Sequence, residues 1–84
     1  MYKIIPDSAA IDQVAALPVE ALEDYAQVLS VLSVVPWNGA PQNENNPDGA
    51  VRVWLFGPGK AGQVIYLVLD SPAEVHILLV LWAG

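Results

Sequence analysis

Residues 51–82 read VRVWLFGPGKAGQVIYLVLDSPAEVHILLVLW, and this stretch decides the fold. It contains three runs rich in β-branched, aromatic and aliphatic residues, Val51–Phe56, Gln63–Asp70 and Glu74–Trp82. Two short joints rich in glycine, proline and small residues separate these runs. Because β-prone runs with short turn-rich joints are typical of antiparallel hairpins, the sequence predicts a three-stranded meander.

The residues before the meander predict a strand followed by a helix. Tyr2–Ile5 is a short β-prone run, and Pro6 ends it. Asp7 or Ser8 can cap the helix, because a side-chain oxygen at this position accepts a free backbone N–H of the first turn. We expect this helix to run to about Leu17.

A second helix is predicted between Pro18, which is tolerated in a first helical turn, and Pro36, which ends it. Its apolar residues follow the helical spacing and define one face: Leu22, Tyr25, Ala26, Leu29 and Leu32. The complete order is strand, helix, helix and three strands. It predicts a single α+β domain over residues 1–84, with a helix hairpin packed on one face of a mainly antiparallel sheet.

Alternation assigns the meander side chains to two faces. One face is wholly aliphatic, and we expect it to receive the helices: Val51, Val53, Leu55, Ile65, Leu67, Leu69, Val75, Ile77, Leu79 and Leu81. The other carries the aromatic rings with the arginine and the histidine: Arg52, Trp54, Phe56, Val64, Tyr66, Val68, Asp70, Glu74, His76, Leu78, Val80 and Trp82. Since this face is also apolar in bulk, we expect a second copy or another protein to cover it. Trp54, Phe56 and Trp82 are the predicted partner contacts.

Composition excludes several classes of protein. Hydrophobic residues make up 55% of the 84 residues and charged residues 14%, which excludes intrinsic disorder. The chain has no cysteine, hence no disulfide or thiolate metal site, and no cofactor or other metal site is predicted. The net charge of −6 argues against a generic nucleic-acid binder. No apolar run has the length of a membrane span, so we expect a soluble, cytoplasmic protein.

Two turn-rich segments have an ordinary and a functional interpretation. Gly57–Gly62 matches the pattern G-x-G-x-x-G, but a phosphate-binding loop needs a helix after it, and here a strand follows. We therefore predict a hairpin loop. Residues 36–50 form a long segment of Pro, Asn, Gly and Asp. It is predicted to be a plain linker, with a functional loop as the alternative, because irregular connections of this length are uncommon.

One group of residues has candidate acid–base chemistry. If the three strands pair in order, His76 lies near Tyr66 and Arg52. His76 or Tyr66 could then transfer a proton while Arg52 stabilises the charge that develops on an attacked phosphate of RNA. The alternative, which a set of one histidine and one arginine favours, is a half-buried histidine beside an aromatic neighbour at an interface.

Element order and local sequence together resemble the RelE/ParE superfamily of toxins from type II toxin–antitoxin systems. The resemblance covers nearly the whole chain and includes VRVWLFG at 51–57, YLVLD at 66–70 and EVHILLVLW at 74–82. It implies the RelE/ParE fold and a small antitoxin protein as partner. RelE-like members cut mRNA on the ribosome, with several Lys and Arg around the sheet and a Tyr or His near the last strand. ParE-like members poison gyrase.

The resemblance implies Arg52 for phosphate charge and His76 or Tyr66 for proton transfer in a ribonuclease. Leu78-Leu79 stands where members often have an arginine. Three hypotheses therefore stay open: a toxin that cleaves mRNA as a ribosome-dependent endoribonuclease, a gyrase-directed toxin, and a non-catalytic interaction module. The last would act through its apolar sheet face, as a homodimer or in a complex with another protein.

Overall fold

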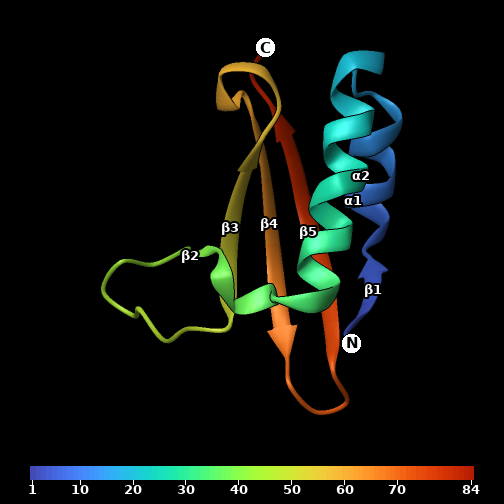
Figure 1. Cartoon of the computed structure of the whole chain (residues 1–84). Helices are drawn as coiled ribbons and strands as arrows, with labels where there is room; N and C mark the ends of the chain where they lie inside the picture. The colour runs from blue at the N-terminus through green and yellow to red at the C-terminus, as the bar shows by residue number, and fades with distance from the viewer.

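The computed structural model describes residues 1–84 as a five-stranded sheet with two helices (Figure 1). In chain order the elements are β1 (Lys3–Pro6), α1 (Ser8–Ala15), α2 (Val19–Val34), the 3₁₀ turn η1 (Pro36–Asn38), β2 (Ala40–Pro41), β3 (Val51–Phe56), the 3₁₀ turn η2 (Pro58–Lys60), β4 (Gly62–Leu69) and β5 (Glu74–Trp82). The strands lie in the order β1-β5-β4-β3-β2, with β1 parallel to β5 and all other neighbours antiparallel. This confirms the predicted α+β fold and adds β2 inside the 36–50 segment.

The two helices form the predicted hairpin, with differences at their ends and faces. Asp7 occupies the cap position of α1, but its side chain makes no capping hydrogen bond, and α1 ends at Ala15 rather than at Leu17. On α2 the buried residues are Ala21, Tyr25, Val28 and Leu32. Leu22 and Ala26, which were predicted to be buried, are exposed. The buried stripe is therefore rotated by about one residue, because the helix packs against aromatic side chains of the sheet rather than on a flat aliphatic surface.

The helices cover the opposite face of β3 and β4 from the one that alternation favoured. The buried strand residues are Arg52, Phe56, Gly62, Val64, Tyr66, Val68, Val75, Ile77 and Val80. The prediction that the aliphatic set receives the helices is therefore wrong for β3 and β4, and holds on β5 only for Val75 and Ile77. Aromatic rings have the larger apolar area to bury, so they occupy the space beneath the helices.

The pairing of β4 with β5 explains why simple alternation fails there. Four residues connect Leu69 to its partner Glu74. An odd-numbered residue of β4 therefore pairs with an even-numbered residue of β5, and the two share a face. The register then shifts: Tyr66 pairs with Ile77, whereas Ile65 pairs with Leu79. Leu78 is the extra residue of this bulge, and beyond it the parity of β5 reverses. His76 consequently lies opposite Leu67, on the other face of the sheet from Tyr66.

The three predicted partner contacts lie on the helix side of the sheet. The Phe56 ring is buried, with its centroid 5.9 Å from that of Tyr25 and 6.1 Å from that of Trp82. Trp54 and Trp82 are half-buried and pack against the same core. The expectation that these rings lie on a face away from the helices is therefore wrong, because they fill the intramolecular core instead.

We predict that Ile77→Ala lowers the free energy of unfolding by about 3 kcal/mol, because the side chain has no exposed area and its removal leaves a cavity. Leu81 lies on the same strand but is 41% exposed, so Leu81→Ala should cost less than about 1 kcal/mol. Urea denaturation of the two variants measures both values. Equal losses would contradict the assignment of the faces.

Candidate functional site

The face of the sheet that the helices leave uncovered is almost entirely aliphatic. We call it the open face and define it by Val51, Val53, Leu55, Ile65, Leu67, Leu69, Leu79 and Leu81. Leu55, Leu79 and Leu81 are 46%, 37% and 41% exposed, and the other five are partly exposed. Gln63 lies between Leu55 and Leu81, and the rest of this surface is aliphatic. A largely aliphatic surface of this kind is characteristic of a protein–protein contact. The expectation of an apolar second face is confirmed, although its residues differ from those predicted.

A histidine and a carboxylate stand at one end of the open face. His76 Nε2 lies 2.9 Å from Glu74 Oε1, and both side chains are about one quarter exposed. On β4 their partners are Leu67 and Leu69, respectively, and on the parallel strand β1 Lys3 is opposite Glu74. A carboxylate in this position accepts a hydrogen bond from the imidazole and orients its ring. Glu74 was missed as a candidate, although residues two apart on a strand share a face.

Arg52 holds the 36–50 segment rather than facing solvent. Its guanidinium donates to the carbonyl of Gly39 from Nε at 3.1 Å and from an Nη at 2.7 Å. Further bonds reach the carbonyls of Pro47 at 2.8 Å, Gly49 at 3.3 Å and Trp37 at 3.3 Å. The Trp37 ring covers the guanidinium at 5.5 Å, and the residue is only 8% exposed. These contacts give Arg52 a structural role in fixing the 36–50 segment and leave little room for a phosphate.

Tyr66 is buried beneath the same segment. Arg52 and Tyr66 are direct partners across β3 and β4, so these two predicted neighbours do lie together. The Tyr66 hydroxyl donates to the Pro36 carbonyl at 2.7 Å, and the side chain has no exposed area. Burial raises the pKa of Tyr66 to about 12, even with the Arg52 charge nearby. The hydroxyl therefore stays protonated at neutral pH and is not accessible to a substrate.

The structure thus separates the three predicted catalytic residues. Arg52 and Tyr66 lie on the helix side, whereas His76 lies on the open face, so the expectation that they converge is wrong. The cause is the four-residue β4–β5 turn, which pairs residues of opposite parity and turns His76 away.

Asp70, at the end of β4, joins the N-terminus to η1. Its Oδ1 accepts hydrogen bonds from Trp37 Nε1 at 2.8 Å and from the Tyr2 hydroxyl at 2.7 Å. These two hydrogen bonds lower the pKa of Asp70, and the bond from Trp37 has the larger effect. The sequence gives no sign of this contact, because its three residues are far apart in the chain.

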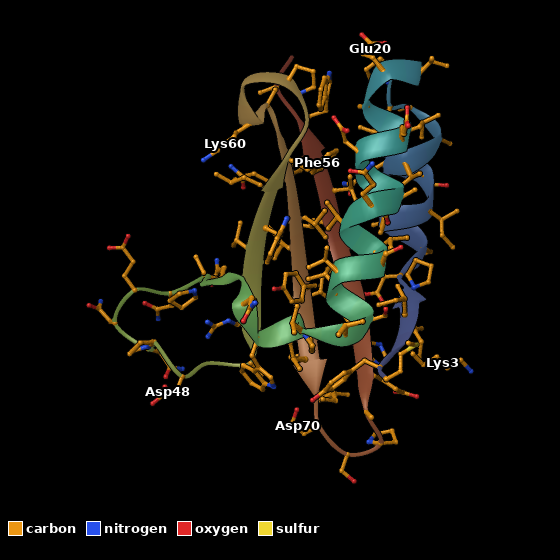
Figure 2. The ribbon with its side chains drawn as sticks, viewed as in Figure 1. Lys3, Glu20, Asp48, Phe56, Lys60 and Asp70 are labelled. Carbon is orange, nitrogen blue, oxygen red and sulfur yellow. The ribbon has the colours of Figure 1, made fainter.

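The basic residues do not form a patch. Figure 2 shows Lys3 and Lys60 at opposite ends of the molecule, while Arg52 is buried. No group of acidic or histidine side chains has the arrangement of a metal site. The Gly57–Gly62 segment connects two antiparallel strands, and Gly57 and Gly59 have φ of 82° and 63°, which confirms the predicted hairpin loop. Neither helix is long and apolar enough to cross a bilayer.

Comparison with known proteins identifies the fold. No family model matches the chain, and no curated protein matches it in sequence. The isolated Escherichia coli RelE toxin superposes with a TM-score of 0.80 at 15% identity, over 100% of this chain and 86% of that one. The intact E. coli RelBE toxin–antitoxin complex gives 0.78 at 16% identity, over 100% and 99%. An archaeal RelE–RelB complex from Pyrococcus horikoshii OT3 gives 0.68 at 17%, over 99% and 96%.

These superpositions confirm the predicted RelE/ParE fold over the full length of the chain. At such low identity the likeness establishes the arrangement of strands and helices. The chemistry of the site depends on the residues that this chain places there.

We predict that Arg52→Lys lowers the free energy of unfolding by about 3 kcal/mol, because lysine cannot satisfy several buried carbonyls at once. The 36–50 segment should then be cut faster in limited proteolysis. Lys60→Met, a charge loss at an exposed lysine, is the matched control and should change stability by less than about 0.5 kcal/mol. Equal urea midpoints for the Arg52 variant and the unmodified protein would contradict a structural role.

Proposed function

We propose that this chain is the toxin-fold component of a type II toxin–antitoxin pair and acts by binding proteins on its open face. The observation that carries the proposal is the uncovered aliphatic surface on a sheet of the RelE fold. Leu79 and Leu81 are exposed neighbours on β5, and Leu55 is exposed on β3, with Gln63 of β4 between Leu55 and Leu81. Covering them with a partner would remove apolar area from water and stabilise a complex.

The distribution of charge supports a protein partner at this face. Many of the acidic residues belong to the helices, including Asp12, Glu20, Glu23 and Asp24, and the helices pack on the opposite side of the sheet. On the open face Glu74 is the one carboxylate, and it lies 2.9 Å from the His76 imidazole. A partner can cover this surface without burying a carboxylate that lacks a hydrogen-bond partner, which would be costly.

The solved relatives support an antitoxin as the class of partner. Two of the superposed structures are complexes of RelE with RelB, an antitoxin in the E. coli case. Carried over to this chain, the corresponding partner is a small antitoxin protein. A homodimer through the same face is the alternative, and it would appear as a stable dimer of the purified chain.

We predict that expression of the chain alone arrests bacterial growth and that co-expression of the small protein encoded beside it relieves the arrest. Leu79→Asp, on the open face, should abolish the arrest and weaken binding of that small protein at least about tenfold, because it buries a charge in the contact. Val19→Asp is the matched control, since Val19 is 82% exposed on α2, on the other side of the molecule.

Binding affinities come from calorimetry on the purified proteins, and growth is followed by optical density. Unaffected growth with the unmodified chain would contradict the toxin function. Equal effects of Leu79→Asp and Val19→Asp would contradict the open face as the binding surface, because only one of the two substitutions lies on it.

A second candidate function is cleavage of mRNA on the ribosome, and the His76–Glu74 pair favours it. The 2.9 Å contact gives the open face one imidazole that a carboxylate orients. His76 would act as the general base that removes the proton from an RNA 2′-hydroxyl. Because Arg52 is engaged with carbonyl groups, Lys3, opposite Glu74 on β1, is the nearest basic residue along the strands that could neutralise phosphate charge.

We predict that, if the chain is a ribonuclease, His76→Gln lowers cleavage of a ribosome-bound transcript about a hundredfold or more, because the general base is lost. Gln63→Ala is the control. Gln63 is another polar residue on the open face, and its loss should leave cleavage unchanged. Primer extension on the transcript detects the cut. Intact transcript after incubation with the unmodified chain would contradict this second function, but not the protein-binding one.

A further inference from the structure

The outer edge of β3 is covered along only part of its length. β2 is two residues long and pairs with Arg52 and Val53. On the other side β3 pairs with β4 along its whole length. Residues 54–56 therefore have no strand on their outer side, and Figure 1 shows this part of β3 running beyond the end of β2.

The direction of the backbone groups follows from the bonds on both sides of β3. The amide of Gln42 donates to the Val51 carbonyl at 3.0 Å, so odd-numbered residues turn their N–H and C=O groups toward β2. The amide of Val68 donates to the Ala50 carbonyl at 2.9 Å, so even-numbered residues face β4. The N–H and C=O of Leu55 consequently point outward, where β2 has already ended.

Protection of this edge is weak. Natural sheets block free edges with lysine, proline, bulges or a covering segment. The sequence Trp54-Leu55-Phe56 contains no charge and no proline, and the register shift in the sheet lies between β4 and β5. Leu55 is 46% exposed. An exposed apolar strand edge of this kind is a template for another strand.

A groove lies beside the edge on the helix side. It has a volume of about 230 Å³, and Val28, Val31, Trp54 and Phe56 supply its apolar walls, with Asp24 and Gln27 at its polar side. A strand paired with β3 turns every second side chain to the face that Trp54 and Phe56 occupy. Those side chains would enter the groove, while the intervening ones would extend the open face.

We propose that an extended segment of a partner protein adds to the sheet alongside Trp54–Phe56, with apolar side chains in the groove and a basic side chain at Asp24. The free N–H and C=O of Leu55 require an extended backbone in the occupant, and the apolar walls require alternate apolar residues. The basic residue is indicated by Asp24 and by a net charge of −6. A second copy fits less well, because it brings the same net charge and the same carboxylate to the contact.

This interaction is independent of the proposed contact on the open face, since it uses a strand edge and a groove on the helix side. It holds for a toxin-fold protein and for a non-catalytic module alike. Loss of growth arrest after Leu79→Asp would therefore give no information about it, and the test below needs no knowledge of the biological partner.

The probe is a synthetic nonapeptide, acetyl-Thr-Val-Thr-Val-Thr-Lys-Thr-Val-Thr-amide, titrated into the ¹⁵N-labelled chain. Its valines and its lysine occupy alternate positions and therefore share one face of an extended strand. The expected result is chemical-shift changes at the amides of Trp54, Leu55 and Phe56 and at Val28 and Val31, together with slower hydrogen exchange at Leu55. Asp24→Lys should weaken binding about fivefold at low salt, because it replaces an attraction by a repulsion. Glu23→Lys is the matched control, since it makes the same change of charge at an exposed residue outside the groove.

A second probe tests the backbone pairing. The same peptide with N-methyl groups on alternate residues cannot donate along one edge, and it should cause none of these shifts. Absence of shifts at β3 at about 1 mM peptide would overturn the proposal, because binding weaker than this is not specific. Shifts confined to open-face residues of β4 and β5, equal binding of the N-methylated peptide, or protection of the Leu55 amide by self-association of the chain without peptide would also overturn it.

Discussion

Two helices cover one face of a sheet that is apolar on both faces, and the rest of the structure follows from this incomplete cover. Tyr66, Ile77 and Leu32 lie between helices and sheet with no exposed area. On the other side Leu55, Leu79 and Leu81 of the open face remain 37–46% exposed, so covering each of them would contribute about 1 kcal/mol. The helices also leave part of β3 beside an apolar groove. The open face therefore lies where the helix layer is absent, and the groove lies where that layer ends, between α2 and the edge of β3.

The 36–50 segment shows how polar residues become structural in a small domain. Arg52, Tyr66 and Asp70 each bond to residues 36–49, and no buried side-chain nitrogen or oxygen is left without a partner. The arginine is largely buried because several carbonyl groups and a tryptophan ring replace its water. Removing such a group leaves the carbonyls unsatisfied, which costs more than the bonds contribute. Arg52 and Tyr66 would suit phosphate chemistry in a solvent-exposed site, but in this chain they hold the 36–50 segment in place.

His76 lies on the other face of the sheet from Arg52 and Tyr66, so the RelE-like fold does not by itself bring these three residues together. The superposed RelE structures share the arrangement of elements with this chain but only 15–17% of its residues. A fold can keep its layers while the chemistry of its faces changes, because the core restricts volume and pattern rather than particular surface residues. In this chain the open face carries leucines and one histidine–glutamate pair.

The sequence by itself determined the order of elements, the three-stranded meander and the nature of the Gly57–Gly62 loop, because turn residues and hydrophobic period act over a few neighbours. It also predicted the neighbours Arg52 and Tyr66, since a five-residue connection keeps the parity of β3 and β4. Only the tertiary structure decided which face the helices cover and on which face His76 lies. Both faces are apolar enough to form a core, so local sequence does not decide which of them the helices cover. That decision depends on contacts between residues far apart in the chain: the packing of the aromatic rings, the bulge at Leu78 and the carbonyl groups that bind Arg52.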